Sequence, residues 1–320
     1  MDKQLQEGDR LYLIAESLAQ DFSLFPRTDR DEVLPGCLGR REIVRRADHL
    51  SRLDVDGYIE AVVSAAEDPA RTPAPVVIRQ LGRVLMEEAE GPFYAAVLEM
   101  AFEGDAREVG FIAQDRSYRN GEWGPQHHLR AADTLRRFSR RSIPVVTLMD
   151  TPGADAKEEA NRNNQAHSIS RLIAEASNLD VPNVGIVYGL GYSGGAIPLA
   201  ASNMILALRD SVFSTIQPKS LASIARRLNL SWQECAKYVG LGACELYQQG
   251  NIDGVIDYSP SDEDPENLRL AIVAGIARVE ASCKEFVADN PYILEHYRQS
   301  LRRFLSPSEN LKRMQDSAAL

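Results

Sequence analysis

Apolar residues recur at helical spacing along the first seventy residues of the chain. The segments "RLYLIAESLAQDF", "GRREIVRRADHLSRL" and "VDGYIEAVVSAAED" place apolar positions three or four residues apart, which predicts amphipathic helices. The three prolines of "DPARTPAP" then predict an interruption of regular structure. We therefore expect a helical N-terminal segment over residues 1–70.

From about residue 76, short apolar runs alternate with amphipathic stretches. The segments that predict strands are "REVGFIAQD", "IPVVTLMD", "VPNVGIVY", "MILALRD", "VFSTIQ" and "NIDGVIDY". The spacing predicts helices over "GPQHHLRAADTLRRFSRR", over residues 158–178, and in three short pieces over residues 221–249. This alternation predicts an α/β domain with a largely parallel sheet over residues 71–260. Two further helical segments, "PENLRLAIVAGIARVEASCKEFVADN" and "YILEHYRQSLRRFL", predict C-terminal helices over residues 261–320.

Composition narrows the class of protein. The 320 residues are 44% hydrophobic, enough for a large core, and the formal net charge of −10 argues against non-specific nucleic-acid binding. The four cysteines form no C-x-x-C pair, so we expect reduced thiols in a cytoplasmic protein and no metal site in this chain.

The N-terminus lacks the apolar core of a signal peptide, and no apolar run reaches the roughly 18 residues of a membrane span. The basic run over residues 40–46 is either a phosphate contact or a solvated helix face, and we favour the second.

The stretch "GLGYSGGA", residues 189–196, lies between a predicted strand and a predicted short helix. Its first six residues match G-x-G-x-x-G, and Asp210 ends a strand about twenty residues later, as in a dinucleotide-binding turn. The turn comes late in the chain, however, and the helix after it is short. The "SGGA" part offers a different chemistry, because backbone N–H groups at a helix start can form an oxyanion hole. Tight helix–strand packing with no ligand is the alternative.

A second turn, "TPGA" at residues 151–154, follows the strand "IPVVTLMD". The carboxyl ends of neighbouring parallel strands lie at one edge of a sheet, where ligands bind in open α/β folds. Both turns are therefore expected at the same edge.

Several segments in order resemble one enzyme family. "IPVVTLMDTPGA", "NQAHSISRLIAEASNLDVPNVGIVYGLGYSGGA", "FSTIQPKSLASI" and "GNIDGVID" resemble the carboxyltransferase α subunit of bacterial acetyl-CoA carboxylase, from about residue 110 to residue 257. The segment "ADHLSRLDVDGYIEAV" looks like a diverged version of that family's N-terminal region. The resemblance implies a crotonase-like fold, a spiral of ββα units, rather than a Rossmann sheet.

The resemblance also implies a reaction and a site. The family transfers CO2 from carboxybiotin to the α-carbon of an acyl-CoA, with acetyl-CoA expected here, and malonyl-CoA is then a product used for fatty acid biosynthesis. Backbone N–H groups around Gly194, Gly195 and Ala196 are expected to hold the biotin ureido oxygen. The residues expected to bind biotin or substrate are Thr151, Pro152, Gly153, Ala154, Gln165, Gly191, Tyr192 and Ser193.

The family resemblance implies partners as well. A β-type subunit would carry the zinc ribbon and the oxyanion hole for the thioester, and a biotin carboxyl carrier protein would deliver the cofactor. The expected assembly is α2β2.

The chain departs from the family pattern near the presumed site. "DAKEEANRNNQ" lacks the glycines usual after "TPGA", and "QPKS" (residues 217–220) replaces a Ser-Pro-Glu-Gly turn. Asp115 stands in "QDRS" where a lysine is usual. These changes keep two alternatives open: a biotin-independent acyl-CoA hydratase or decarboxylase, and a non-catalytic paralogue that scaffolds or regulates a carboxyltransferase.

Other candidate residues carry weaker signals. We expect a solvated or capping role for His127 and His128, because adjacent helical residues point about 100° apart. His167 could reach the site, but a helix-packing role is favoured. "NIDGVID" is either the Ile-Asp turn of crotonase-like enzymes or a plain strand entry that needs Gly254 for backbone reasons.

Overall fold

The structure is a computed structural model that describes residues 33–224 and 226–289. The helices expected over "RLYLIAESLAQDF" and "YILEHYRQSLRRFL" lie outside the described residues.

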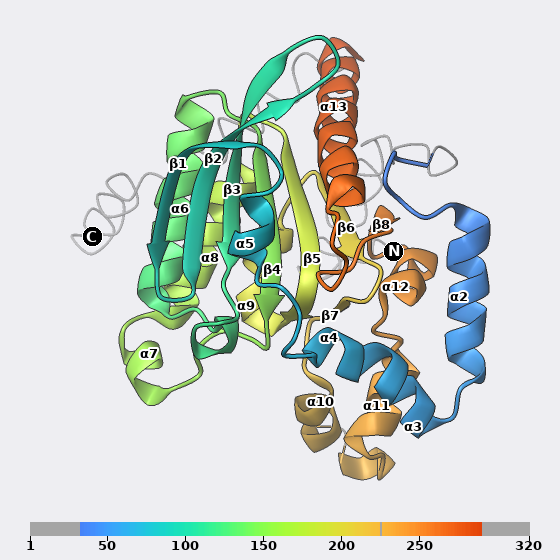
Figure 1. Ribbon diagram of the computed structural model, residues 1–320. Helices are drawn as coiled ribbons and strands as arrows, with labels where there is room; N and C mark the ends of the chain where they lie inside the picture. Colours follow the sequence, from blue (N-terminus) through green and yellow to red (C-terminus); the bar gives the residue numbers. More distant parts are fainter. Residues whose placement is uncertain (1–32, 225, 290–320) are drawn as a thin grey trace, which may run out of the picture.

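The fold is built on one eight-stranded mixed sheet (Figure 1). Its strands are β1 (Arg83–Glu90), β2 (Phe93–Ala101), β3 (Ala106–Gln114), β4 (Val145–Thr151), β5 (Asn183–Tyr192), β6 (Met204–Leu208), β7 (Val212–Ser214) and β8 (Gly254–Ile256). They lie in the order β1-β2-β3-β4-β5-β6-β8, and β7 pairs with the end of β5. The first three strands are antiparallel, and every pairing from β3 onward is parallel. The α/β expectation is thus confirmed.

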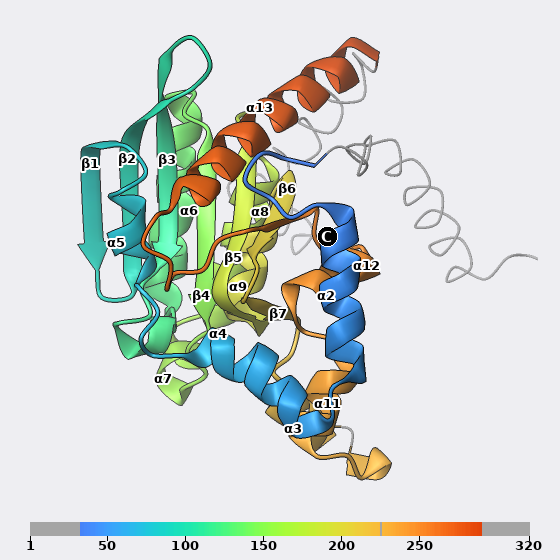
Figure 2. The ribbon, with the colours of Figure 1, turned by 45° about the vertical axis from the view of Figure 1, so that its right-hand side comes forward.

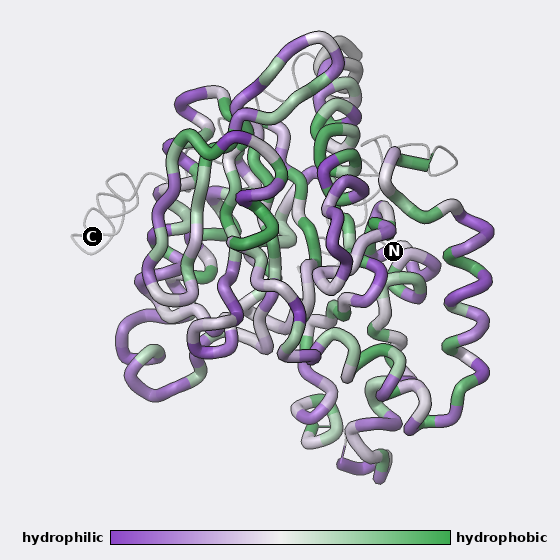
Figure 3. Tube along the Cα trace, in the orientation of Figure 1, coloured by the Kyte–Doolittle hydropathy of each residue, from purple (hydrophilic) through white to green (hydrophobic). Residues whose placement is uncertain are grey.

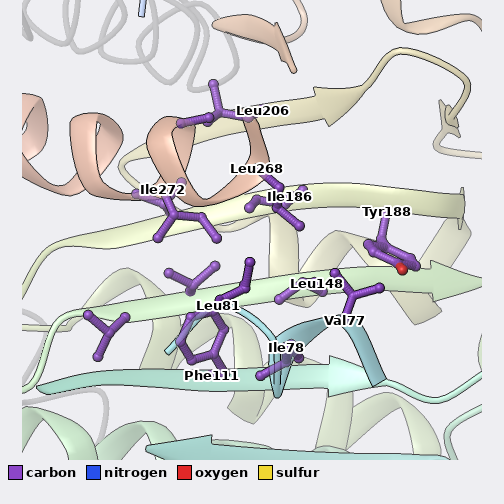
Figure 4. Packing of buried hydrophobic residues seen from close by; sticks show 14 of the residues in the cluster. Val77, Ile78, Leu81, Phe111, Leu148, Ile186, Tyr188, Leu206, Leu268 and Ile272 are labelled. Atoms are coloured by element: carbon purple, nitrogen blue, oxygen red, sulfur yellow. The ribbon is translucent and has the colours of Figure 1, made fainter. Parts of the chain in front are cut away.

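Helices cover both faces of this sheet, because its central strands carry apolar side chains on both sides. On one face lie α6 (Pro125–Arg140), α8 (Gln165–Ser177) and α9 (Ser193–Ala200), and on the other lie α5 (Ala74–Ile78) and α13 (Glu266–Asp289). All of β4 is buried, and its side chains alternate between the two cores: Val145 and Met149 join one, Val146 and Leu148 the other. Figure 4 shows the second core, where Leu268 and Ile272 of α13 pack over Leu148 and Ile186.

Helices from the N-terminal part and from the later part of the chain lie beside the end of β5 (Figure 2), and some of them form a third packed cluster there. The N-terminal part supplies α2 (Arg40–Arg52), α3 (Val55–Tyr58), the π-helix η1 (Ile59–Ser64) and α4 (Ala65–Glu67). The later part supplies α10 (Pro218–Ile224), η3 (Arg226–Leu228), α11 (Trp232–Val239) and α12 (Ala243–Gln249). Among the described helices, none is both long and apolar enough to cross a membrane.

Two features differ from the sequence expectations. The strands β1 and β2 were not predicted, because β1 is exposed along nearly its whole length and β2 is buried without alternation. The single helix expected over residues 158–178 is divided into α7 (Glu158–Arg162) and α8, since Asn164 adopts a left-handed conformation with φ of 65°. The loop that carries α7 is mostly hydrophilic (Figure 3). The domain limits at residues 70 and 260 stay predictions.

A buried arginine fastens the loop between α4 and α5 to the sheet. The Arg71 guanidinium donates to the Asp210 carboxylate at 2.5 Å and to the Tyr188 carbonyl at 2.6 Å. Its side chain is only 4% exposed, whereas that of the surface arginine Arg83, which pairs with Glu99, is 68% exposed.

Replacing this arginine should destabilise the fold. We expect Arg71→Met to lower the free energy of unfolding by about 3 kcal/mol, because it leaves a partly buried carboxylate uncompensated. Arg83→Met is the matched control and should cost less than about 1 kcal/mol. Urea denaturation measures both. Equal losses would contradict the role of Arg71, and adding Asp210→Asn to Arg71→Met should recover part of the loss.

Candidate active site

The register of β4 and β5 brings the two predicted turns together. The strands are parallel, and Thr151 at the end of β4 pairs with Gly191 near the end of β5. The register shifts between Met149 and Thr151, so Asp150 lies at an irregularity where the ladder ends. "TPGA" and "SGGA" therefore leave the same edge of the sheet as neighbours, as the sequence predicted.

The "TPGA" turn is held by its own threonine. The Thr151 hydroxyl donates to the Gly153 carbonyl at 2.7 Å, and the Gly153 N–H reaches the same oxygen at 3.2 Å. Gly153 has φ of 151°, and a Cβ built on it would meet no heavy atom within 4 Å. The turn thus presents backbone with open space in front of it.

The helix α9 starts directly from the end of β5. Ser193 makes this sharp change of direction with φ of 55°, a left-handed conformation that a non-glycine residue adopts at a cost of about 1–2 kcal/mol. Because the first N–H groups of a helix have no intrahelical acceptor, the free donors here are those of Ser193, Gly194 and Gly195. The N–H of Ala196 is the first that falls within reach of a helical partner, the Tyr192 carbonyl. Two of the three N–H groups expected as donors, those of Gly194 and Gly195, are thus free at the start of α9, and that of Ala196 lies where a helical hydrogen bond forms.

The two turns are in backbone contact. A Cβ built on Gly195 would lie 2.5 Å from the Gly153 carbonyl carbon and 2.8 Å from the Ala154 nitrogen. A Cβ on Gly194 would meet only the Ile169 Cδ1 of α8, at 3.2 Å. Gly195 is required for the approach of the two turns, whereas Gly194 borders freer space.

Neighbouring strands supply donors to the carbonyls of α9. The Gln114 side chain at the end of β3 donates to the Gly195 carbonyl at 2.8 Å, and the Thr147 hydroxyl of β4 donates to the Leu199 carbonyl at 2.8 Å. Pro198 lies inside the helix and has no N–H, so the Gly194 carbonyl lacks its usual helical donor. This short helix is held in place by the sheet beneath it.

Residues 107–291 match the family described as acetyl co-enzyme A carboxylase carboxyltransferase-like. The match spans more than half of the chain. The chain belongs to this family.

Curated relatives are carboxyl transferase subunits. The chain is 29% identical over 272 residues to the acetyl-coenzyme A carboxylase carboxyl transferase subunits beta/alpha of Parafrankia sp. (strain EAN1pec), covering 83% of this chain and 42% of the relative. It is 32% identical over 199 residues to the subunit alpha of Coxiella burnetii (strain RSA 331 / Henzerling II), covering 60% of this chain and 61% of the relative. The chain thus spans about half the length of these relatives.

Solved structures share the fold at low identity. A single-chain, multi-domain long-chain acyl-CoA carboxylase superposes with a TM-score of 0.52 at 21% identity, over 65% of this chain and 22% of that one. The malonate decarboxylase MdcD-MdcE hetero-dimer of Pseudomonas gives 0.51 at 16%, over 65% of this chain and 86% of that one. The crotonase-like class expected from the sequence is the fold of this family member.

Two predicted binding side chains are buried in this carboxyltransferase-like chain. Tyr192 is 3% exposed and belongs to the third hydrophobic cluster, so its ring is packed in the interior. Burial raises the pKa of its hydroxyl far above the usual range, and the charge of Glu67 adds to this. Gln165 is 4% exposed and donates to the Trp123 carbonyl at 2.9 Å. Both side chains therefore support the backbone of the site from the protein interior.

The histidines are placed differently from the expectation of solvated side chains. His127 and His128 are both buried, and Nδ1 of His127 accepts the Gly124 N–H at 3.0 Å, which is the capping role foreseen for the pair. Burial lowers the pKa of His128 to about 4, and its Nε2 lies near the Gly194 backbone without a hydrogen-bond partner. His167 is exposed on α8 and does not pack.

The departures from the family pattern are structurally accommodated. Gln217 of "QPKS" donates to the Pro152 carbonyl and so braces the "TPGA" turn. Lys219 points away to lie 5.3 Å from the centre of the Trp232 ring, and Ser220 lies within α10, where no left-handed conformation is needed. The Asp115 carboxylate accepts the N–H of Ser117 at 3.0 Å and remains within its own turn.

The acid that a dinucleotide-binding turn would need for the ribose is engaged elsewhere. Asp210 is engaged by Arg71 and by the Ser259 hydroxyl at 2.6 Å, so it serves the fold. In "NIDGVID", Asp253 accepts the Ile205 N–H at 2.8 Å and caps the edge of β6, which agrees with the strand-entry interpretation.

Asp150 was not among the residues predicted to be functional. Its carboxylate is buried, accepts the Leu190 N–H at 3.0 Å and lies 3.8 Å from the Arg116 guanidinium. Burial raises the pKa of Asp150 from 3.8 to about 6, although Arg116 and the Leu190 N–H oppose the shift. A charged residue at the end of the largely apolar run "IPVVTLM" was the available signal.

This raised pKa makes stability depend on pH in a defined direction. Between 3.8 and about 6 the folded state binds a proton that the unfolded state has released, so the Asp150 contribution is lost as pH rises through this window. The loss is on the order of 3 kcal/mol. Asp150→Asn keeps an acceptor for Leu190 and should remove this loss. Urea denaturation across the window should therefore show the variant gaining stability relative to the parent as pH rises, and a constant difference would refute the assignment.

Proposed function

We propose that this chain is the α-type carboxyltransferase subunit of a biotin-dependent acyl-CoA carboxylase. The reaction moves CO2 from carboxybiotin to the α-carbon of an acyl-CoA, with acetyl-CoA as the expected substrate and malonyl-CoA as the product. The single observation that carries the proposal is the backbone contact between Gly195 and the Gly153–Ala154 peptide, which sets the free N–H groups at the start of α9 beside the open space in front of Gly153.

The chemistry needs hydrogen-bond donors that are aimed before the reaction begins. Carboxybiotin, when bound, would supply the CO2, and negative charge would develop on its ureido oxygen. The free N–H groups of Ser193, Gly194 and Gly195 can stabilise this charge at the positive end of α9. Since these donors are fixed by the fold, they need no reorganisation as the charge develops.

The residues present fit such a ligand. The open space in front of Gly153 and the single neighbour of Gly194 leave room for a ring system against bare backbone. Thr151 and Gln217 brace the adjoining wall from either side of Pro152. The buried Gln165 keeps the Trp123 loop against this wall.

The proposal includes the partners. A β-type subunit bearing the zinc ribbon would supply the oxyanion hole for the thioester, and a biotin carboxyl carrier protein would bring the cofactor. The naming of the Parafrankia relative as subunits beta/alpha supports a paired arrangement. We propose an α2β2 assembly that acts in the cytoplasm in fatty acid biosynthesis.

Reconstitution tests the proposed function. The chain is purified with a β-type subunit and a biotinylated carrier, and transfer of an isotope-labelled carboxyl group to short acyl-CoAs is followed by chromatography. We expect labelled malonyl-CoA only when all components are present. A folded complex that transfers nothing would favour the scaffolding paralogue, and conversion of acyl-CoA by the isolated chain would favour the hydratase or decarboxylase.

Blocking the space beside the free donors should abolish transfer without unfolding the chain. Gly194→Val places its side chain against the mobile end of Ile169, and we expect turnover to fall by about a hundredfold or more. Gly39→Val is the matched control, since a Cβ there meets no heavy atom within 4 Å. Gel filtration should show normal assembly for both variants. Retained turnover in Gly194→Val would remove the oxyanion assignment.

A further inference from the structure

Both ends of one buried side-chain amide are hydrogen-bonded at the edge of the site. Gln114 ends β3 and is 0% exposed. Its Oε1 accepts the Asp150 N–H at 3.0 Å, and its Nε2 donates to the Gly195 carbonyl at 2.8 Å. Because one backbone partner can only donate and the other can only accept, the orientation of the amide is fixed.

The first bond closes a gap in the sheet. The last backbone pair of β3 and β4 is Ala113 with Leu148, and beyond it the β4–β5 register shifts. Gln114 gives the buried N–H of Asp150 the acceptor that it would otherwise lack. An unpaired buried N–H costs about 1–3 kcal/mol.

The second bond reaches the helix that carries the free donors. The Gly195 carbonyl belongs to the first turn of α9, and the backbone of the same residue rests on the Gly153–Ala154 peptide. The Gln114 amide therefore ties the end of β4, from which "TPGA" departs, to the start of α9. The separation and tilt of the two turns depend on this link.

We infer that Gln114 is a positioning residue, a buried amide that holds the N-terminus of α9 against the "TPGA" turn so that the N–H groups of Gly194 and Gly195 stay aimed at the developing charge. This inference rests on the proposed carboxyl transfer for its catalytic meaning. Gln114 has no exposed surface, so it acts through the backbone.

A protonated glutamic acid offers the same hydrogen bonds as this glutamine. Its O–H can donate to the Gly195 carbonyl while its carbonyl oxygen accepts the Asp150 N–H. The ionised form has no donor, so a carboxylate oxygen would face the Gly195 carbonyl oxygen and the two acceptors would repel each other. Burial and the nearby Asp150 carboxyl should raise the pKa of a glutamate at this position. The other titratable groups around this point are Arg116, Arg71 and Asp115, which act on Asp150, and His128 beside Gly194.

The test compares Gln114→Glu and Gln114→Leu with the parent in the complete complex. For Gln114→Leu we expect kcat to fall between about tenfold and a hundredfold, with little change in the KM for acyl-CoA, because misaimed donors weaken transition-state binding. For Gln114→Glu we expect a similar loss at about pH 8 and recovery towards about pH 6. Taking the ratio to the parent at each pH removes the pH dependence that the two enzymes share. The same changes at the exposed Gln80 serve as controls and should leave kcat unaltered.

Hydrogen exchange of residues 189–200 provides a readout that does not need turnover. Relative to the parent at the same pH, we expect faster amide exchange in Gln114→Leu at every pH. In Gln114→Glu we expect faster exchange only above the pKa of the new carboxyl. A parent complex that transfers nothing would defeat the proposed function while this measurement still decides the positioning role. Parental kcat in Gln114→Leu, or a Gln114→Glu ratio that does not change with pH in either readout, would overturn the inference.

Discussion

No side chain fits between the first turn of α9 and the turn that follows β4. The Gly195 α-carbon faces the Gly153–Ala154 peptide so closely that even a methyl group would lie 2.5 Å from a backbone atom. This contact joins two segments about forty residues apart and requires parallel β4 and β5 that end in step. This contact is held by the sheet, by the two hydrophobic cores on its faces and by the buried polar residues at its edge.

The sheet provides rigidity and the polar residues provide alignment. Hydrophobic side chains on both faces of β4 and β5 exclude water from the strands that carry the turns. At the strand ends the apolar pattern gives way to Gln114, Asp150 and Thr151, whose side chains bond the backbone groups that the ladder leaves unpaired. Hydrophobic packing alone would leave these backbone groups without hydrogen-bond partners. The site therefore combines an apolar core with polar side chains at the ends of the strands.

Much of this could be predicted from local sequence, and the failures have physical causes. Apolar runs predicted β3 to β6, and the glycine turns predicted the edge where they meet, because both signals are contiguous in the chain. The exposed β1 has no such signal. The burial of Tyr192 depends on the distant N-terminal helices, and the bonds of Gln114 join residues 36 and 81 positions apart, which no local pattern encodes. That the N–H of Ser193 is also free depends on where α9 begins, which is the least certain part of any sequence-based assignment.

The composition of α9 has a consequence for how the site comes into existence. Two glycines and a proline among eight residues make a segment that would not be helical in isolation. Its carbonyls receive donors from β3 and β4, which are distant in sequence. The helix can therefore form only after the central strands have paired, and its free N–H groups are aligned among the last events of folding. A chain that is trapped before that stage would have a collapsed core without the aligned N–H groups, so the presence of α9 reports completed folding of the sheet.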